Sequence, residues 1–127
     1  MTPLRTIHAT APIRICDNGG WTDTWFARHG KVFNIAVRPL VAVRLDVFPR
    51  GSRDARVVLD ALDYGTRYAP ALDSNTWGPH PLLEAAFREI RPPDDADIEI
   101  TIRSDAPAGA STGTSASVAN DWIPSTL

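Results

Sequence analysis

The chain has 127 residues, a hydrophobic share of 43% and a formal net charge of −2 at pH 7. That length fits one small domain, and the hydrophobic share is enough for a packed core, so a wholly disordered chain is excluded. The near-neutral charge argues against nucleic acid or an anionic membrane as partner. With a lone cysteine, Cys16, and neither a signal peptide nor an apolar stretch long enough to span a bilayer, the sequence predicts a soluble cytoplasmic protein.

The N-terminal half is predicted to form three strands and one short helix. The strands are expected at residues 7–16, 32–37 and 41–48, and the helix at 24–28. In the third strand, Arg44 and Asp46 alternate with apolar residues, namely Val41, Val43, Leu45 and Val47. This alternation is typical of a strand with one buried face.

The C-terminal half is predicted to alternate strands with a helix. Residues 56–59 and 64–68 are expected to pair antiparallel, and residues 73–79 to form a loop. Pro81 suits the first position of a helix that ends before Pro92, with an apolar face made of Leu82, Leu83, Ala86, Phe87 and Ile90. A last strand follows, in which Ile98, Ile100 and Ile102 alternate with Glu99, Thr101 and Arg103.

The segment after this last strand, DAPAGASTGTSASVA at residues 105–119, is rich in small and hydroxyl residues. Gly109 and Gly113 allow the backbone to turn its N–H groups toward an anion, and a helix start beyond them would favour negative charge. The segment is not a Walker loop, because no Lys follows the second glycine. Its composition is equally typical of an ordinary connector.

Two motifs in this sequence resemble those of one family. Residues 107–116, PAGASTGTSA, resemble the phosphate loop PxGxGLGSSA of the GHMP kinases, with Ser111 and Thr112 departing from the usual Gly and Leu. Residues 11–24, APIRICDNGGWTDT, and residues 30–37, GKVFNIAV, resemble the N-terminal motif of the sugar-kinase branch, which includes fucokinase and heptose 7-phosphate kinases. The chain is therefore expected to form the α+β N-terminal lobe of a GHMP kinase, a fold like the second domain of ribosomal protein S5.

The resemblance implies ATP and Mg²⁺ as cofactors. The residues expected to hold the ATP phosphates are Pro107, Gly109, Ser111, Gly113, Thr114 and Ser115. The Ser115 hydroxyl would also reach Mg²⁺, although a neutral hydroxyl is a weak ligand that needs the nucleotide and an acidic side chain nearby. A hydroxyl that satisfies a backbone N–H at a helix start is the structural alternative for Ser115.

The resemblance also implies a sugar or sugar phosphate as the phosphoryl acceptor. Its binding residues would be Arg14, Gly20, Asp23 and Asn34. A guanidinium can hold a phosphate, and a carboxylate accepts hydrogen bonds from sugar hydroxyls. A surface ion pair or an Asx-type turn would explain Arg14 and Asp23 equally well, and Asn34 could simply cap a turn.

No catalytic residue is assigned, because the family places its catalytic Asp after the phosphate-loop helix. Residues 1–119 are expected to form the lobe and residues 120–127 a tail outside the family pattern, and a C-terminal lobe is expected to be absent. Three interpretations remain open. The chain is a truncated and inactive sugar kinase, one half of a kinase that assembles with itself or with a separate C-terminal lobe, or a non-catalytic nucleotide-binding or interaction module.

Overall fold

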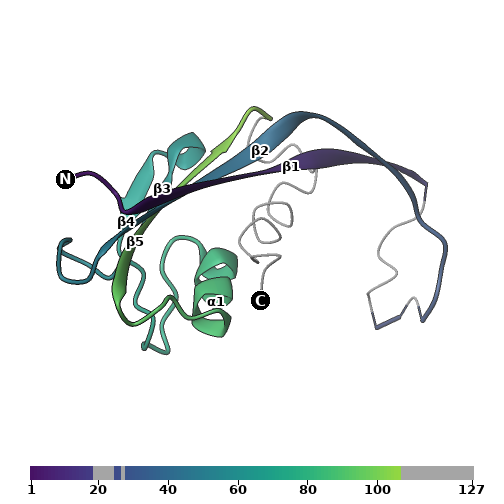
Figure 1. The fold of residues 1–127 in the computed structure, drawn as a ribbon. Coiled ribbons are helices and arrows are strands. Elements are labelled where there is room, and N and C mark those ends of the chain that lie inside the picture. The colour runs from purple at the N-terminus through teal and green to yellow at the C-terminus, as the bar shows by residue number, and fades with distance from the viewer. Residues whose placement is uncertain (19–24, 27, 107–127) are drawn as a thin grey trace.

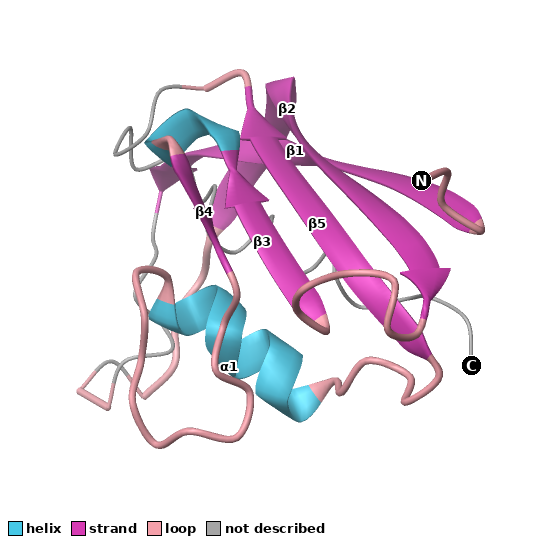
Figure 2. Ribbon diagram, turned by 90° about the vertical axis from the view of Figure 1, so that its left-hand side faces the viewer, coloured by secondary structure: helices cyan, strands magenta, loops and turns pink. Residues whose placement is uncertain are grey.

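The residues that the structure describes form a five-stranded sheet with one α-helix on one of its faces (Figures 1 and 2). The computed structural model describes residues 1–18, 25–26 and 28–106. The strand order is β1-β2-β5-β3-β4. The elements are β1 (Arg5–Asn18), β2 (Phe33–Pro49), β3 (Val57–Ala61), the 3-10 helix η1 (Leu62–Tyr64), β4 (Thr66–Tyr68), α1 (Pro81–Glu89) and β5 (Ala96–Ser104).

Strands β1 and β2 form a long antiparallel pair that extends beyond the rest of the sheet. β5 pairs with β2 only from Val41 to Pro49, so β1 is the one strand among the described residues that pairs with the part of β2 before Val41. We call this two-stranded part, Ile13–Asn18 with Phe33–Val37, the ribbon. Figure 1 shows it extending away from α1 and the other strands.

The other three strands form a compact unit with α1. β3 pairs antiparallel with β4 and parallel with β5, and α1 lies on the chain between β4 and β5. The turn between η1 and β4 favours glycine at position 65. The φ of Gly65 is 59°, in the left-handed region, and this backbone conformation is less favourable for a residue that has a Cβ. Figure 2 shows α1 against one face of the sheet, below β3 and β4.

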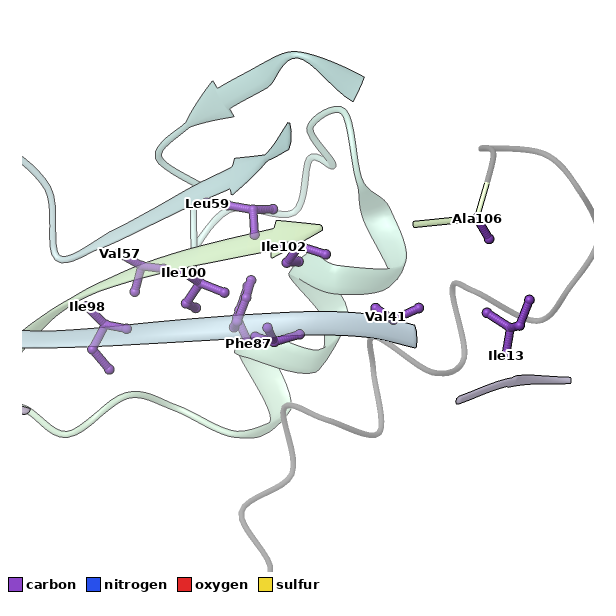
Figure 3. Close-up of a cluster of buried hydrophobic side chains, with 10 residues drawn as sticks. Ile13, Val41, Val57, Leu59, Phe87, Ile98, Ile100, Ile102 and Ala106 are labelled. Atoms are coloured by element: carbon purple, nitrogen blue, oxygen red, sulfur yellow. The ribbon is translucent and has the colours of Figure 1, made fainter. Parts of the chain in front are cut away.

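The core lies between that face and α1 (Figure 3). Leu59 from β3 and Ile100 from β5 are 0% and 1% exposed, and Phe87 from α1 packs against them at 2%. Burying one such side chain contributes about 1.5–3 kcal/mol. The period-two pattern of the strands therefore directs their apolar side chains to a single face, where α1 covers them.

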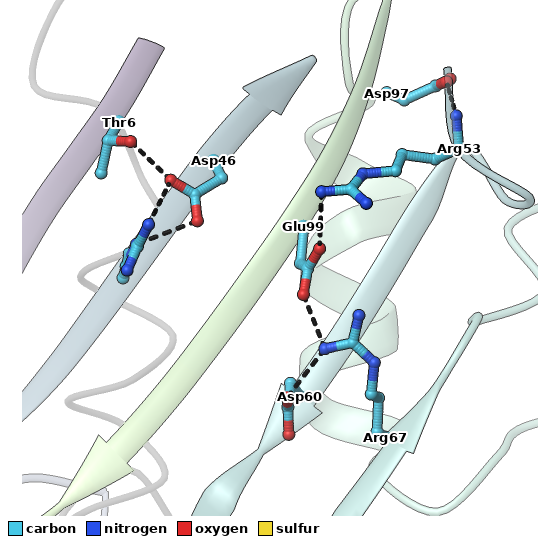
Figure 4. A network of polar contacts seen from close by, with 8 residues as sticks. Thr6, Asp46, Arg53, Asp60, Arg67, Asp97 and Glu99 are labelled. Atoms are coloured by element: carbon cyan, nitrogen blue, oxygen red, sulfur yellow. Dashed lines mark hydrogen bonds and ion pairs between the residues drawn. The ribbon is translucent and has the colours of Figure 1, made fainter. Parts of the chain in front are cut away.

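Arginine–carboxylate pairs cover the opposite face (Figure 4). Arg67 on β4 binds Glu99 on β5 at 2.6 Å and Asp60 on β3 at 2.9 Å, which links three strands through one guanidinium. On β2, Asp46 accepts hydrogen bonds from Thr6 and Arg44. Burial acts to raise the pKa of Asp46, but these two donors outweigh it and hold the pKa below its ordinary value.

Most predicted elements are confirmed. The first strand, the antiparallel pair, the loop at 73–79, the helix from Pro81 and the last strand are all present, and the α+β class is confirmed. The two strands predicted at 32–37 and 41–48 are one strand, because a bulge accommodates Arg38 and Pro39 between the pairs Ile13–Val37 and Pro12–Leu40.

Two local predictions were wrong. Trp25 and Phe26 lie in a turn and Arg28 has a φ of 56°, so the described residues of the short helix predicted at 24–28 are not helical. Thr24 and Ala27 lie outside the described residues. On α1, Leu82 is 54% exposed, whereas Glu84 is 1% exposed. Glu84 can be buried because Tyr68 at the end of β4 and Gly78 in the following loop donate hydrogen bonds to it, which a pattern of apolar residues cannot reveal.

Candidate functional site

A pocket of about 190 Å³ opens where β3 and β5 end and α1 begins. Its wall combines apolar and aromatic side chains with a few polar ones. The lining residues are Ala61, Asp63, Tyr64, Pro79, His80, Pro81, Leu82, Leu83, Ile102 and Ser104. Such a concave, mostly apolar site with a few convergent polar groups is the usual form of a small-molecule site.

The chain leaves this pocket toward the segment predicted to bind phosphate. Ser104 ends β5, and its backbone N–H donates to the Asp63 carboxylate at 2.5 Å. The Ser104 hydroxyl accepts a hydrogen bond from the N–H of Ala106 at 3.1 Å. These contacts fix the last described residues next to the pocket, immediately before Pro107.

One side of the pocket is held by aromatic and histidine contacts. The His80 ring lies 5.1 Å from the Tyr64 ring, centroid to centroid. Its Nε2 shares a hydrogen bond of 2.8 Å with the Thr66 hydroxyl. The pocket wall is thus tied to β4 as well as to α1.

Behind this wall, Glu84 is a buried carboxylate. It accepts hydrogen bonds from the Tyr68 hydroxyl at 2.7 Å and from the Gly78 N–H at 2.9 Å. Burial acts to raise the pKa of Glu84, but the N–H of Gly78 and the Tyr68 hydroxyl outweigh it, so the pKa is lowered. Burial and the nearby carboxylate raise the pKa of Tyr68. Glu84 is therefore charged and Tyr68 neutral at pH 7.

Two of the predicted acceptor-binding residues lie on one face of the ribbon. Arg14 pairs with Ala36 in the register of β1 and β2, and Asn34 is two residues before Ala36. Because alternate residues of a strand share a face, Arg14 and Asn34 lie on the same face, and both are exposed. Gly20 and Asp23 lie outside the described residues.

The phosphate-binding prediction also falls outside the described residues. This holds for every residue assigned to it, namely Pro107, Gly109, Ser111, Gly113, Thr114 and Ser115. Among residues 1–18, 25–26 and 28–106, no group of three His, Cys, Asp or Glu side chains is arranged to hold a metal ion. None of the helices in this described part combines the length and apolar character needed to cross a membrane.

Solved structures of kinases share this fold. A protein assigned as a sugar kinase from Campylobacter jejuni matches 91% of this chain with a TM-score of 0.63 at 19% identity. A D-glycero-D-manno-heptose 1-phosphate kinase from Bacteroides thetaiotaomicron matches 92% with a TM-score of 0.67 at 21% identity. The mevalonate kinase of Methanococcus jannaschii matches 93% with a TM-score of 0.63 at 13% identity.

The chain has the fold of one part of these kinases. It spans about 40% of the length of the structures it matches, from 38% to 40%. No protein-family model and no curated protein sequence matches it. The resemblance to GHMP kinases is confirmed at the level of the fold, and the assignment to the ribosomal protein S5 type stays a prediction.

Within this kinase fold, sequence reasoning missed the pocket and Glu84. The pocket is formed by residues far apart in the sequence, from Ala61 to Ser104, so no local motif marks it. Glu84 did carry one signal, because it lies three residues before Phe87 and shares its side of the helix. A charged residue at a core-facing helical position indicates a buried polar partner.

Proposed function

We propose that this chain is the nucleotide- and acceptor-binding part of an ATP-dependent kinase that phosphorylates a hydroxyl of a sugar or sugar phosphate. The shared fold with sugar kinases supports the reaction class. The observation that carries the proposal is the pocket at the end of β5, because Ser104 in its wall stands three residues before Pro107. A base pocket would thus adjoin the proposed phosphate loop.

The pocket suits the adenine base of ATP. Tyr64, Leu82 and Ile102 offer apolar surface to the faces of a flat ring, and aromatic contacts of this kind favour purines. Asp63 and His80 place an acceptor and a ring nitrogen at the wall, where the polar edge of a base could pair. The proposal assigns the base to these residues and the phosphates to residues 107–115.

The chain's own residues would bind and orient, which is most of what phosphoryl transfer needs from a protein. Bound with ATP, magnesium neutralises phosphate charge, and Ser115 is the residue proposed to contact it. On the acceptor side, Arg14 and Asn34 would hold the sugar or its phosphate from the exposed face of the ribbon, together with Gly20 and Asp23. Cys16, the lone cysteine, fits the reducing cytoplasm in which we place the chain.

The proposal assigns binding, not turnover, to this chain. It treats residues 1–119 as the lobe and residues 120–127 as a tail, and it leaves the catalytic carboxylate to another part of a complete kinase. The proposed consequence is weak ATP binding without phosphoryl transfer to neutral sugars or heptose phosphates.

One observation favours a second candidate, half of a split kinase. On the ribbon, the apolar side chains of Ile15, Phe33 and Ile35 are 50%, 56% and 46% exposed. Exposed apolar surface of this kind promotes association with another chain or another copy. A non-catalytic nucleotide-binding module would share the pocket but would need no partner.

Two matched leucines test the base pocket. Leu82 lines it and is 54% exposed, while Leu62 is 51% exposed and does not line it. Leu82→Ala is expected to weaken ATP binding roughly fivefold in calorimetric titration, because part of the apolar wall is lost, whereas Leu62→Ala leaves it unchanged. Equal effects, or no ATP binding by the parent chain, would refute the base pocket.

A third variant tests the phosphate loop. Gly113→Val is expected to abolish ATP and pyrophosphate binding, because a β-branched side chain blocks close backbone approach to a phosphate. Adenosine, which has no phosphate, should still bind the pocket of this variant. If Gly113→Val binds ATP like the parent, residues 107–115 are an ordinary connector.

A further inference from the structure

The loop at residues 69–80 joins β4 to α1 and supplies one wall of the pocket, Pro79 and His80. It contains no helix or strand, so its shape depends on side-chain contacts. Two residues one turn apart on α1, Glu84 and Arg88, provide several of them.

Glu84 holds the end of the loop nearest the pocket. Its Oε2 accepts the backbone N–H of Gly78, the residue before Pro79, at 2.9 Å. Its Oε1 accepts the hydroxyl of Tyr68, whose ring lies 6.0 Å from the His80 ring. The carboxylate therefore reaches both pocket-wall residues through neighbours that it binds directly.

Arg88 holds the more distant part of the loop. Its Nη2 donates to the carbonyl oxygens of Ala71 at 3.1 Å and Thr76 at 2.6 Å. Its guanidinium lies 3.8 Å from the centre of the Trp77 ring, a cation–π contact. Arg88 therefore orders the loop away from the pocket, and Glu84 orders it at the wall.

We propose that Glu84 is the positioning residue of the pocket: it fixes the Pro79–His80 wall in the shape that binds a nucleotide base. This inference rests on the proposed function. A charged side chain that is 1% exposed is costly unless its hydrogen bonds are satisfied, and here the satisfied bonds lead to the pocket wall. Glu84 does not line the pocket itself and acts through Gly78 and Tyr68.

Gly78 gives an independent way to disturb the same contact. A Cβ added there would lie 2.6 Å from Oε1 of Glu84, so Gly78→Ala must displace the carboxylate while Glu84 itself is kept. Glu84→Gln keeps one acceptor oxygen and the side-chain size, so it should restore part of what Glu84→Ala loses. Glu89→Ala, at an exposed position on the same helix, is the matched control.

The experiment measures ATP affinity by calorimetry and the His80 imidazole signals by NMR in each variant. Glu84→Ala and Gly78→Ala are expected to bind ATP about tenfold more weakly and to shift the His80 signals, because the wall loses its hydrogen-bonded support. Glu84→Gln should fall between these and the parent. Glu89→Ala should match the parent in both readouts.

Each outcome decides something. Parent-like affinity and unchanged His80 signals in both Glu84→Ala and Gly78→Ala would overturn the positioning role. If Glu84→Ala does not fold, Gly78→Ala and Glu84→Gln test the positioning role in its place. If the parent chain binds no ATP but the substitutions still shift His80, the proposed function fails and the positioning of the wall by Glu84 stands.

Discussion

The same strand, β2, runs through two very different environments. In its second half, Val41 and Val43 are 0% and 4% exposed, belong to the core cluster that includes Phe87, and are flanked by β1 and β5. In the ribbon, Phe33 and Ile35 are 56% and 46% exposed with β1 as the one pairing strand. Strand formation is therefore decided by the local sequence, whereas the burial of a side chain depends on which elements the fold packs against it.

This contrast divides the molecule by role. The compact unit of α1 with β3, β4 and β5 contains the pocket and, together with Val41 and Val43 of β2, most of the core. Its polar groups are tied by specific contacts such as the Glu84 network. The ribbon contains the exposed Arg14 and Asn34 and, beyond the buried Ile13, the half-exposed apolar side chains of Ile15, Phe33 and Ile35. The compact unit should be sensitive to single substitutions, and the exposed positions of the ribbon should tolerate them.

The largest expected effect compares two isoleucines. Ile100 is 1% exposed and Ile35 is 46% exposed. Ile100→Ala should lower the free energy of unfolding by about 2–5 kcal/mol, because it leaves a cavity in the core. Ile35→Ala should cost less than about 1 kcal/mol, as a half-exposed site can be refilled by water. Urea unfolding measures both, and equal losses would show that the ribbon is part of the core.

A smaller effect is expected at the turn after η1. Gly65 has a φ of 59° and nothing within 4 Å of the position a Cβ would take. Gly65→Ala should therefore cost about 1 kcal/mol through backbone strain alone. Gly65→Asn should cost less, because Asn tolerates the left-handed region. The ranking of the two urea midpoints checks this, and Asn losing as much as Ala would speak against it.

Acid should weaken the compact unit through Glu84. The pKa of Glu84 is lowered on folding, so its stabilising contribution is complete above its unfolded pKa of about 4.3 and is lost as pH falls through the folded value. The parent should then lose stability more steeply below about pH 4 than Glu84→Gln. Asp46 and Asp97 also have lowered pKa values and contribute to the acid sensitivity of both proteins. The measurement is therefore the difference between the urea midpoints of the parent and of Glu84→Gln at each pH.

The smallest effect on stability is expected in the ribbon, at Phe33. Phe33→Ser should change the free energy of unfolding by less than about 1 kcal/mol while reducing any self-association of the chain, because it removes exposed apolar surface. Sedimentation velocity of parent and variant compares their association. A variant that associates as strongly as the parent would show that the ribbon face is not the contact.

The elements could be predicted from the sequence because each depends on local patterns. Ile98, Ile100 and Ile102 alternate with polar residues, and Pro81 marks a helix start, so these elements follow from period and propensity. The exposure of Leu82 and the burial of Glu84 were missed. Glu84 gave one local signal, its place on the core-facing side of the helix, but the donors that satisfy it, Tyr68 and Gly78, lie elsewhere in the sequence. The continuity of β2 was missed because Pro39 resembles a strand end, whereas a bulge accommodates it.

The site divides in the same way. Sequence motifs pointed to Arg14 and Asn34, which β-strand register then places on one face. The pocket depends on residues from β3, η1, α1 and β5 meeting at one edge, which no single motif encodes. The phosphate-loop and acceptor assignments at Gly113, Ser115, Gly20 and Asp23 stay predictions.

Backbone amide NMR during ATP titration tests the base pocket most directly. We predict saturable shifts at Ala61, Tyr64 and Ser104, which line the pocket, and unchanged signals at Ile15 and Ile35 in the ribbon. Adenosine should shift the same pocket signals, since it carries the base without phosphates. Shifts that do not saturate at the pocket, or that occur only in the ribbon, would contradict a nucleotide-binding role for this pocket.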